Sequence, residues 1–194
     1  PQMEERSEVM HQYEKINGLY QLLSGNRKNS RMDIETYVQR HYLEQILEAA
    51  NQRFQDMSAG QFELRMCDID KAGTGKNRGL DLMVYSAVTG KVREVRTLSG
   101  GESFMAALSL ALGMADQIQE SSAAINLDMM FIDEGFGSLD EHSRDQAVKV
   151  LQNMAEGEKL IGIISHVTEL KQEIEDQLIV TKDDQGSHTR WQIS

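Results

Sequence analysis

The sequence predicts an α/β fold in which a parallel or mixed sheet is flanked by helices and preceded by a further helical segment. Two apolar runs, at residues 129–133 and 160–164, have the length of strands that are buried on both faces. Each run is followed by a segment of helical periodicity, and strands that alternate with helices form parallel pairs. A third observation, apolar residues spaced three and four apart near the start of the chain, predicts the preceding helix.

The composition of the chain fits one domain, or one domain with an appendage, because its 194 residues are 40% hydrophobic. No apolar stretch approaches the roughly 20 residues that span a bilayer, and the polar first residues are not a secretory signal. The single cysteine, Cys67, excludes an internal disulfide and fits a reducing compartment, so we expect a cytoplasmic protein with no membrane partner. The net charge of −11 argues against a free-standing nucleic-acid binder, because phosphate contacts need Lys and Arg.

The first helix carries a heptad pattern and is expected to end at residues 24–26. Its apolar residues are separated by steps of four, three, four and three positions: Val9, Tyr13, Ile16, Tyr20 and Leu23. Two heptads do not distinguish a coiled coil from an amphipathic helix that lies on the domain. The pattern alone therefore leaves both alternatives open.

A second helix and three strands are expected next. Asp33 can cap a helix that runs to about Met57, and Gly60 ends it. Alternating apolar residues predict the strands, which are expected at 62–66, at 80–84 and, after a tight turn at 89–90, through residues 92–95. A flexible loop is expected at residues 71–77.

The second half of the chain alternates helices with strands. Helices are expected at 103–119, at 141–155 and, as a short turn, near residue 169. Besides the two apolar runs, strands are expected at 178–180 and around Trp191, joined by a polar turn at 183–187.

The strand predicted at residues 129–133 ends in two acids, Asp133 and Glu134. The carboxyl edge of the sheet is where α/β proteins bind ligands, and adjacent residues of a strand point to opposite sides. Asp133 can therefore hold Mg²⁺, directly or through water, while Glu134 can orient and polarise a water that attacks a γ-phosphate. The alternative is an acidic junction between a strand and a loop, which is common.

Residues 98–102, Leu-Ser-Gly-Gly-Glu, precede a predicted helix. Free backbone N–H groups at a helix start attract anions, the two glycines let a phosphate approach closely, and Ser99 adds a hydroxyl donor. The alternative is an N-cap followed by a flexible turn.

Asp140 and His166 complete the set of candidate polar residues. Asp140 follows a glycine-rich loop beside the acid pair and can reach a subunit boundary, cap the helix at Glu141, or do both. His166 follows the strand at 160–164 and could donate a hydrogen bond to a γ-phosphate, although a lone histidine is usually structural.

A phosphate-binding loop is missing from this set. The P-loop pattern requires Gly, four residues, Gly-Lys and then Ser or Thr. The nearest candidate is Gly75-Lys76, but Asp70 stands where the first glycine belongs, and Asn77 follows the lysine. Without the lysine and the amide nest, the chain alone should not hold ATP well.

In this order, the motifs resemble those of the ABC-type ATPase superfamily. Residues 98–102 look like its signature motif, residues 129–134 like its Walker B motif, residues 137–140 like its D-loop, and His166 like its switch histidine.

Within that superfamily, the chain resembles the bacterial SbcC family, whose members are the ATPase subunits of a DNA-repair nuclease. Transporter members usually carry Pro and then Thr or Ser after the acid pair, whereas Gly-Phe-Gly stands at 135–137. Ser and Phe at 103–104 also agree with SbcC more than with transporters. Residues 37–40 and 49–51 look like the segment that joins the SbcC coiled coil to its head, so the similarity runs from about Gly18 to the end.

The resemblance implies that residues 25–194 are the C-terminal lobe of an ABC-type ATPase head and that residues 1–24 are a coiled-coil stub. The P-loop would lie in an N-terminal half of the same protein, and two heads would sandwich two ATP molecules with Mg²⁺. Glu134 and His166 would be catalytic, and Asp133 would bind Mg²⁺, all for the nucleotide of their own head. The residues expected to contact nucleotide across the seam, or to line it, are Ser99, Gly100, Gly101, Glu102 and Asp140.

The partners implied by the resemblance are the N-terminal P-loop half, a second SbcC head, an SbcD-type nuclease and, through that complex, double-stranded DNA. ATP-driven closure would control access of DNA ends to the nuclease, while the isolated chain would be inactive. Three alternatives stay open: a chromosome-organising ATPase of the SMC type, a transporter ATPase fragment, and a non-catalytic module that kept the fold.

Overall fold

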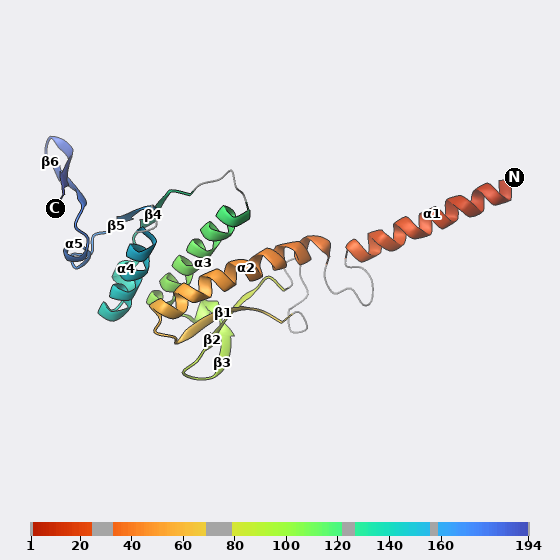
Figure 1. Cartoon of the computed structure of the whole chain (residues 1–194), viewed down its shortest axis with the longest axis horizontal. Coiled ribbons are helices and arrows are strands. Elements are labelled where there is room, and N and C mark those ends of the chain that lie inside the picture. Colours follow the sequence, from red (N-terminus) through yellow and green to blue (C-terminus); the bar gives the residue numbers. More distant parts are fainter. Residues whose placement is uncertain (1, 25–32, 69–78, 122–126, 156–158, 194) are drawn as a thin grey trace.

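The computed structural model describes residues 2–24, 33–68, 79–121, 127–155 and 159–193, and Figure 1 shows their arrangement. Helices, a parallel strand pair and antiparallel strands combine in one mixed α/β architecture, which confirms the predicted fold class. In the described parts, no helix is both long and apolar enough to cross a membrane. The flexible loop expected at 71–77, with its Gly75-Lys76 pair, lies outside the described residues.

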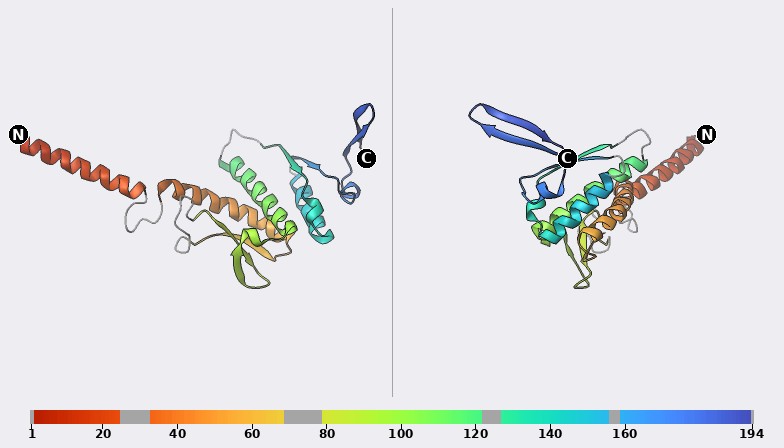
Figure 2. Two further views of the ribbon diagram at one scale, coloured as in Figure 1. Left: turned by 180° about the vertical axis from the view of Figure 1, so that it is seen from behind. Right: turned by 60° about the vertical axis from the view of Figure 1, so that its left-hand side comes forward.

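Helix α1 (Gln2–Leu23) extends away from the rest of the molecule, as Figures 1 and 2 show. Its five heptad positions are between 47% and 67% exposed, so no described part of the domain covers the apolar seam. The alternative of an amphipathic helix lying on the domain is therefore wrong. A coiled-coil role for residues 1–24 agrees with an uncovered seam and remains a prediction, as does the division of the chain at residue 24.

Helix α2 (Ile34–Met57) begins where the sequence predicts. The Asp33 side chain accepts a hydrogen bond of 2.7 Å from the Thr36 backbone N–H, and this bond holds the pKa of Asp33 below its usual value. The helix ends at Met57 with Ser58 as its C-cap, and the chain reverses through Gly60, which adopts a left-handed φ of +74°.

Strands β1 (Phe62–Met66), β2 (Leu82–Ser86) and β3 (Lys91–Glu94) form an antiparallel sheet in that order. The first strand has the predicted bounds, whereas the second begins two residues later than expected. The third strand ends at Glu94, because the chain turns into a short 3-10 helix, η1 (Val95–Thr97), before its predicted end.

The side chain of Asn51 joins α2 to the edge of this sheet. Its amide N–H donates to the Leu64 carbonyl oxygen at 2.8 Å, and its amide oxygen accepts from the Leu64 N–H at 2.7 Å. Both backbone groups of a nearly fully buried edge residue are thereby satisfied, as buried polar groups require.

Helix α3 (Gly100–Ser121) packs along α2, and the two helices lie side by side in both views of Figure 2. They approach closely at Gly113, where an added Cβ would lie 2.6 Å from the Ile46 carbonyl oxygen. The apolar faces of these helices and of α4 (Glu141–Ala155) enclose one core with β1 and β2.

Strands β4 (Met129–Asp133) and β5 (Leu160–Ile164) form a two-stranded parallel sheet with the predicted bounds. The prediction that both faces are buried is wrong. Ile132 belongs to the helical core, but the opposite face is open, with Phe131 64% and Leu160 58% exposed. The described helices cover only one face, and alternate residues of each strand therefore remain uncovered.

The chain ends in a short helix and a hairpin. Helix α5 (Leu170–Glu173) leads into β6 (Gln177–Asp183) and β7 (Gly186–Gln192), which pair antiparallel through the predicted polar turn. Leu178 faces Trp191 across the hairpin, and both side chains are exposed. Figures 1 and 2 show the hairpin projecting from the end of the molecule opposite α1.

Candidate functional site

The two acids lie where β4 ends, as predicted. Asp133 is the last residue of β4, faces Ile164 of β5 in register and is exposed. Its side chain emerges on the open face of the sheet, the same side as Phe131, because strand residues two apart share a face. Glu134 leaves the strand in a left-handed conformation, with φ +59°, and its N–H donates to the Ile164 carbonyl oxygen at 2.9 Å.

Glu134 and His166 are brought together from the ends of neighbouring parallel strands. The Nδ1 atom of His166 lies 3.0 Å from Oε1 and 2.9 Å from Oε2 of Glu134. The carboxylate can only accept, so the histidine N–H donates to it. The side chains of His166 and Glu134 are 80% and 50% exposed, respectively, and can therefore meet a ligand. The Nδ1–H of His166 is used on Glu134, so an oxyanion can accept a hydrogen bond only from Nε2, which carries a hydrogen in the imidazolium form.

Ser99 and Glu102 form a reciprocal capping box at the start of α3. The Ser99 N–H donates to the Glu102 carboxylate at 2.8 Å, and the Glu102 N–H donates to the Ser99 hydroxyl oxygen at 3.3 Å. The N-cap alternative considered for this segment is therefore part of the structure. Among the described residues the Ser99 hydroxyl oxygen acts as an acceptor, which leaves its hydrogen available to an anion.

Arg93, in β3 of the antiparallel sheet, forms hydrogen bonds with residues on both sides of Ser99. The sequence did not predict these contacts. From β3, its guanidinium donates to the Thr97 carbonyl oxygen at 2.5 Å and to the Glu102 carboxylate at 3.2 Å. It thereby holds both ends of the turn that carries Ser99. A basic residue six positions before that serine is the only signal for this contact in the sequence, and it specifies no partner.

Two glycines of the signature-like segment pack against the D-loop-like segment. A Cβ at Gly101 would lie 2.8 Å from the Ser138 carbonyl oxygen, and one at Gly100 would lie 3.6 Å from the Ser138 Cβ. Ser138 itself is held by a hydrogen bond of 2.7 Å from its hydroxyl to the Gly135 carbonyl oxygen. The structure thus brings residues 99–102 and 135–138 into contact.

Asp140 caps α4, as one of its predicted roles requires. Its carboxylate accepts from the Ser143 N–H at 3.0 Å and from the Ser143 hydroxyl at 2.8 Å. These hydrogen bonds, the backbone one foremost, hold the pKa of Asp140 below its usual value. Asp140 is exposed, and within the described residues no hydrogen bond joins it to Glu134 or His166, so its expected place at a subunit boundary remains a prediction.

Asp133 is suited to Mg²⁺ as one ligand among several. Within the described residues, no group of three or more His, Cys, Asp and Glu side chains could hold a metal. Mg²⁺ is commonly bound by one or two carboxylates together with substrate phosphates and water. An exposed carboxylate beside the Glu134–His166 pair fits that pattern, provided that a nucleotide and another segment supply the remaining oxygens.

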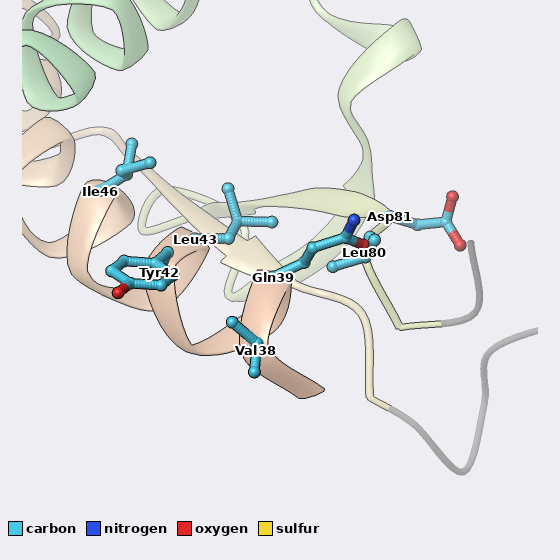
Figure 3. Close-up of a pocket in the computed structure, with 7 residues that line it drawn as sticks. All are labelled: Val38, Gln39, Tyr42, Leu43, Ile46, Leu80 and Asp81. Carbon is cyan, nitrogen blue, oxygen red and sulfur yellow. The ribbon is translucent and has the colours of Figure 1, made fainter. Parts of the chain in front are cut away.

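The predicted site residues lie on an open surface. A pocket of about 630 Å³ lies along α2 and beside the start of β2, as Figure 3 shows. None of the predicted site residues lines this pocket. Its lining is mainly apolar and consists of Val38, Gln39, Tyr42, Leu43, Ile46, Leu80 and Asp81. A nucleotide at Glu134 would therefore need a second surface to enclose it.

Known proteins match this chain over most of its length. Residues 80–153 match the family model described as SbcC/RAD50-like, Walker B motif. The chain is 44% identical to the SbcC subunit of nuclease SbcCD from Treponema pallidum, over 95% of this chain and 17% of that protein. It is also 44% identical to the same-named protein of Vibrio cholerae, over 92% of this chain and 18% of that protein. The chain thus spans less than a fifth of the length of these relatives.

Solved structures of SMC head domains share the fold. A chain from work on the ATP-driven dimerisation and DNA-stimulated activation of SMC ATPases matches with a TM-score of 0.62 at 15% identity, over 80% of this chain and 88% of that one. The Smc head of Pyrococcus furiosus with an extended coiled coil matches with a TM-score of 0.57 at 17% identity. The match covers 80% of this chain and 36% of that one. SbcC proteins align with about nine-tenths of the chain, and residues 80–153 belong to the SbcC/RAD50-like Walker B family.

Proposed function

We propose that the chain is one lobe of an ATPase head, which hydrolyses ATP with Mg²⁺ only after a segment with a phosphate-binding loop completes it. The observation that carries the proposal is the Glu134–His166 pair at the carboxyl ends of β4 and β5. Ligands of α/β proteins bind at this edge. A water held by Glu134 would lie beside the hydrogen-bond donor that a γ-phosphate requires.

Each residue in the completed site has a separate role. Asp133 binds Mg²⁺, directly or through water, and Glu134 orients and polarises the attacking water. His166, as an imidazolium whose Nδ1–H donates to Glu134, donates a hydrogen bond from Nε2–H to the γ-phosphate. A positioned general base contributes about 10²–10⁴ in rate. The hydroxyl of Ser99 and the backbone N–H groups of Gly100 and Gly101 serve the nucleotide of a second head, because the start of α3 offers N–H donors near its exposed end. Glu102 contributes to the same nucleotide site by holding Ser99 through the capping box, in which its own N–H is used.

The missing segment would dock on the open face of the parallel sheet. That face carries exposed Met129, Phe131, Leu160 and Ile164, each at least 55% exposed. Contiguous exposed apolar side chains of this size favour a covering partner, and an isolated pair of strands or a lone hairpin is marginal in water. An N-terminal half of the same protein, with the P-loop, would supply both the cover and the phosphate-binding lysine.

A second head would complete each nucleotide site, with Asp140 at the seam. The proposal predicts complementation between two inactive variants in mixed dimers. In a mixed dimer, a head with Glu134→Gln pairs with a head with Ser99→Arg. The nucleotide bound by the Glu134→Gln head then has both substitutions at its site, whereas the nucleotide bound by the other head has an intact Glu134 and an intact Ser99. Mixed dimers should recover ATP turnover that neither variant shows alone. Failure of the mixture to recover activity would contradict the assignment of Ser99 to the opposite nucleotide.

The larger assembly is proposed from the relatives, which are named as the SbcC component of the nuclease SbcCD. The chain would act with an SbcD-type nuclease on double-stranded DNA in repair and recombination, in the cytoplasm, and α1 would continue into a coiled coil. An SMC-type chromosome-organising ATPase is the second candidate, favoured by the shared fold of SMC heads. Co-purification of an SbcD-type nuclease with the full-length protein separates the two candidates.

The role of Glu134 is tested in the complete head by Glu134→Gln. This change removes the base but keeps the side-chain size, so ATP turnover should fall at least about 100-fold. ATP-dependent dimers should persist and accumulate. The matched control is Glu141→Gln, an exposed acid in the first turn of α4, which should leave turnover unchanged. Equal turnover in both variants would exclude Glu134 as the base.

A further inference from the structure

Phe104 lies between two segments that the proposed function assigns to different nucleotides. It is the fifth residue of α3, two positions after the signature-like residues 98–102, and its ring covers the backbone of Gly135. A Cβ at Gly135 would lie 2.1 Å from Cε2 and 2.2 Å from Cδ2 of Phe104. The same ring meets Phe136 edge-on, with ring centroids 5.0 Å apart. Only a glycine can occupy position 135 under this ring.

The backbone beneath the ring is in an unusual conformation that needs support. Glu134 and Gly135 are consecutive left-handed residues, with φ of +59° and +97°. A non-glycine residue in this region is disfavoured and persists where its surroundings hold it. On one side, the Glu134 N–H is fixed by the Ile164 carbonyl oxygen at 2.9 Å. On the other side, the ring of Phe104 closes over the Gly135 peptide.

We propose that Phe104 is a positioning residue for Glu134 and couples the signature-like segment to the catalytic carboxylate of the same head. The inference rests on the proposed function, in which Ser99 and Glu134 of one chain serve different nucleotides. The ring of Phe104 and the contact between Gly101 and Ser138 join the start of α3 to residues 134–138. Occupation of one nucleotide site is thereby transmitted to the water-activating group of the other.

The test compares two matched substitutions in the full-length protein. Phe104→Leu removes the ring that covers Gly135, and Phe54→Leu removes a fully buried ring of α2 that stacks on Phe62, away from the proposed site. For each variant, kcat, KM for ATP, the Hill coefficient for ATP and the melting temperature are measured. A displacement of about 1 Å at a reacting group can cost about 100-fold in rate. We expect Phe104→Leu to lower kcat by about tenfold or more.

A role in positioning predicts a specific pattern. Phe104→Leu should lower kcat and bring the Hill coefficient toward one, with little change in KM, while Phe54→Leu lowers only the melting temperature. Phe104→Tyr, which keeps the ring, should restore both kcat and the Hill coefficient. If Phe104→Leu is less stable than Phe54→Leu, Phe104→Met is used in its place, because its unbranched, flexible side chain fills the space left by the ring at about the same volume as Leu.

The outcomes separate this inference from the proposed function. No ATP turnover by the wild-type full-length protein would overturn the proposed function itself. An active wild type together with unchanged kcat and Hill coefficient in the Phe104 variants would overturn the positioning role alone. A fall in kcat that Phe54→Leu reproduces at equal melting temperature would also overturn it, because general stability would then account for the loss.

Discussion

Gly101 lies directly against the backbone of Ser138, because a Cβ at Gly101 would be 2.8 Å from the Ser138 carbonyl oxygen. Such a contact leaves no space for any side chain, and a carbonyl group fixed in a turn cannot yield as a flexible side chain can. The neighbouring Gly100 is different, since its added Cβ would meet only the Ser138 Cβ, at an ordinary 3.6 Å. The two glycines of one motif therefore have different structural requirements.

Gly101→Ala should destabilise the fold and separate the two segments. Overpacking of this kind costs about 1–3 kcal/mol in the free energy of unfolding, whereas Gly100→Ala should stay within about 0.5 kcal/mol of wild type. Urea unfolding of the two variants measures both values. Equal stability of the two variants would show that the Gly101–Ser138 approach is not constraining.

Asn51→Ala should lower the stability of the fold, because it removes the side-chain link between α2 and β1. The substitution leaves the N–H and carbonyl groups of the nearly buried Leu64 without their partners, which costs about 1–3 kcal/mol of unfolding free energy. Asn51→Asp should also destabilise, because a carboxylate accepts from the Leu64 N–H but cannot donate to its carbonyl group. Gln52→Ala, at the next, exposed position, is the control. A stability of Asn51→Ala equal to that of the control would remove this link from the account.

Helices and strands whose apolar residues repeat at a regular spacing could be predicted from the sequence. Capping at Asp33 and the strand bounds of β1, β4 and β5 were predicted correctly, because local hydrogen bonding and alternation determine them. The burial of β4 was predicted wrongly, since an apolar run indicates what a strand can bury and not which segment covers it. The third strand ends one residue earlier than predicted, because Val95 belongs to a 3-10 helix. An apolar residue at this position is compatible with either structure.

The candidate site was predicted unevenly. The pairing of Glu134 with His166 follows from parallel strands ending at one edge, so the topology alone made it foreseeable. The contacts of Arg93 and the packing of Phe104 on Gly135 were not foreseeable, because both depend on how turns and loops fold onto one another, which periodicity does not specify. The role of Asp140 at a head boundary, and the contacts of residues 99–102 with nucleotide, remain predictions.

Asp33 should make the stability of the fold depend on pH. The hydrogen bonds from Thr36, the backbone N–H foremost, hold the pKa of Asp33 below its ordinary value of 3.8. Its stabilisation is therefore fully present above pH 3.8 and is lost as the pH falls through the lower, folded-state pKa. Asp33→Asn keeps an oxygen that accepts from Thr36 but does not titrate. The difference in melting temperature between wild type and Asp33→Asn should shrink on acidification over this range. A difference that stays constant with pH would contradict the role of the charge.

The division of the ATPase site between two segments is tested most directly by ATP turnover of this chain alone and of the same chain after assembly with the N-terminal segment that carries the P-loop. The account predicts background turnover for the chain alone, turnover well above background for the assembled head, and loss of that turnover with Glu134→Gln. Robust hydrolysis by the isolated chain would contradict the account, because nothing else would then be needed to hold the triphosphate beside Glu134 and His166.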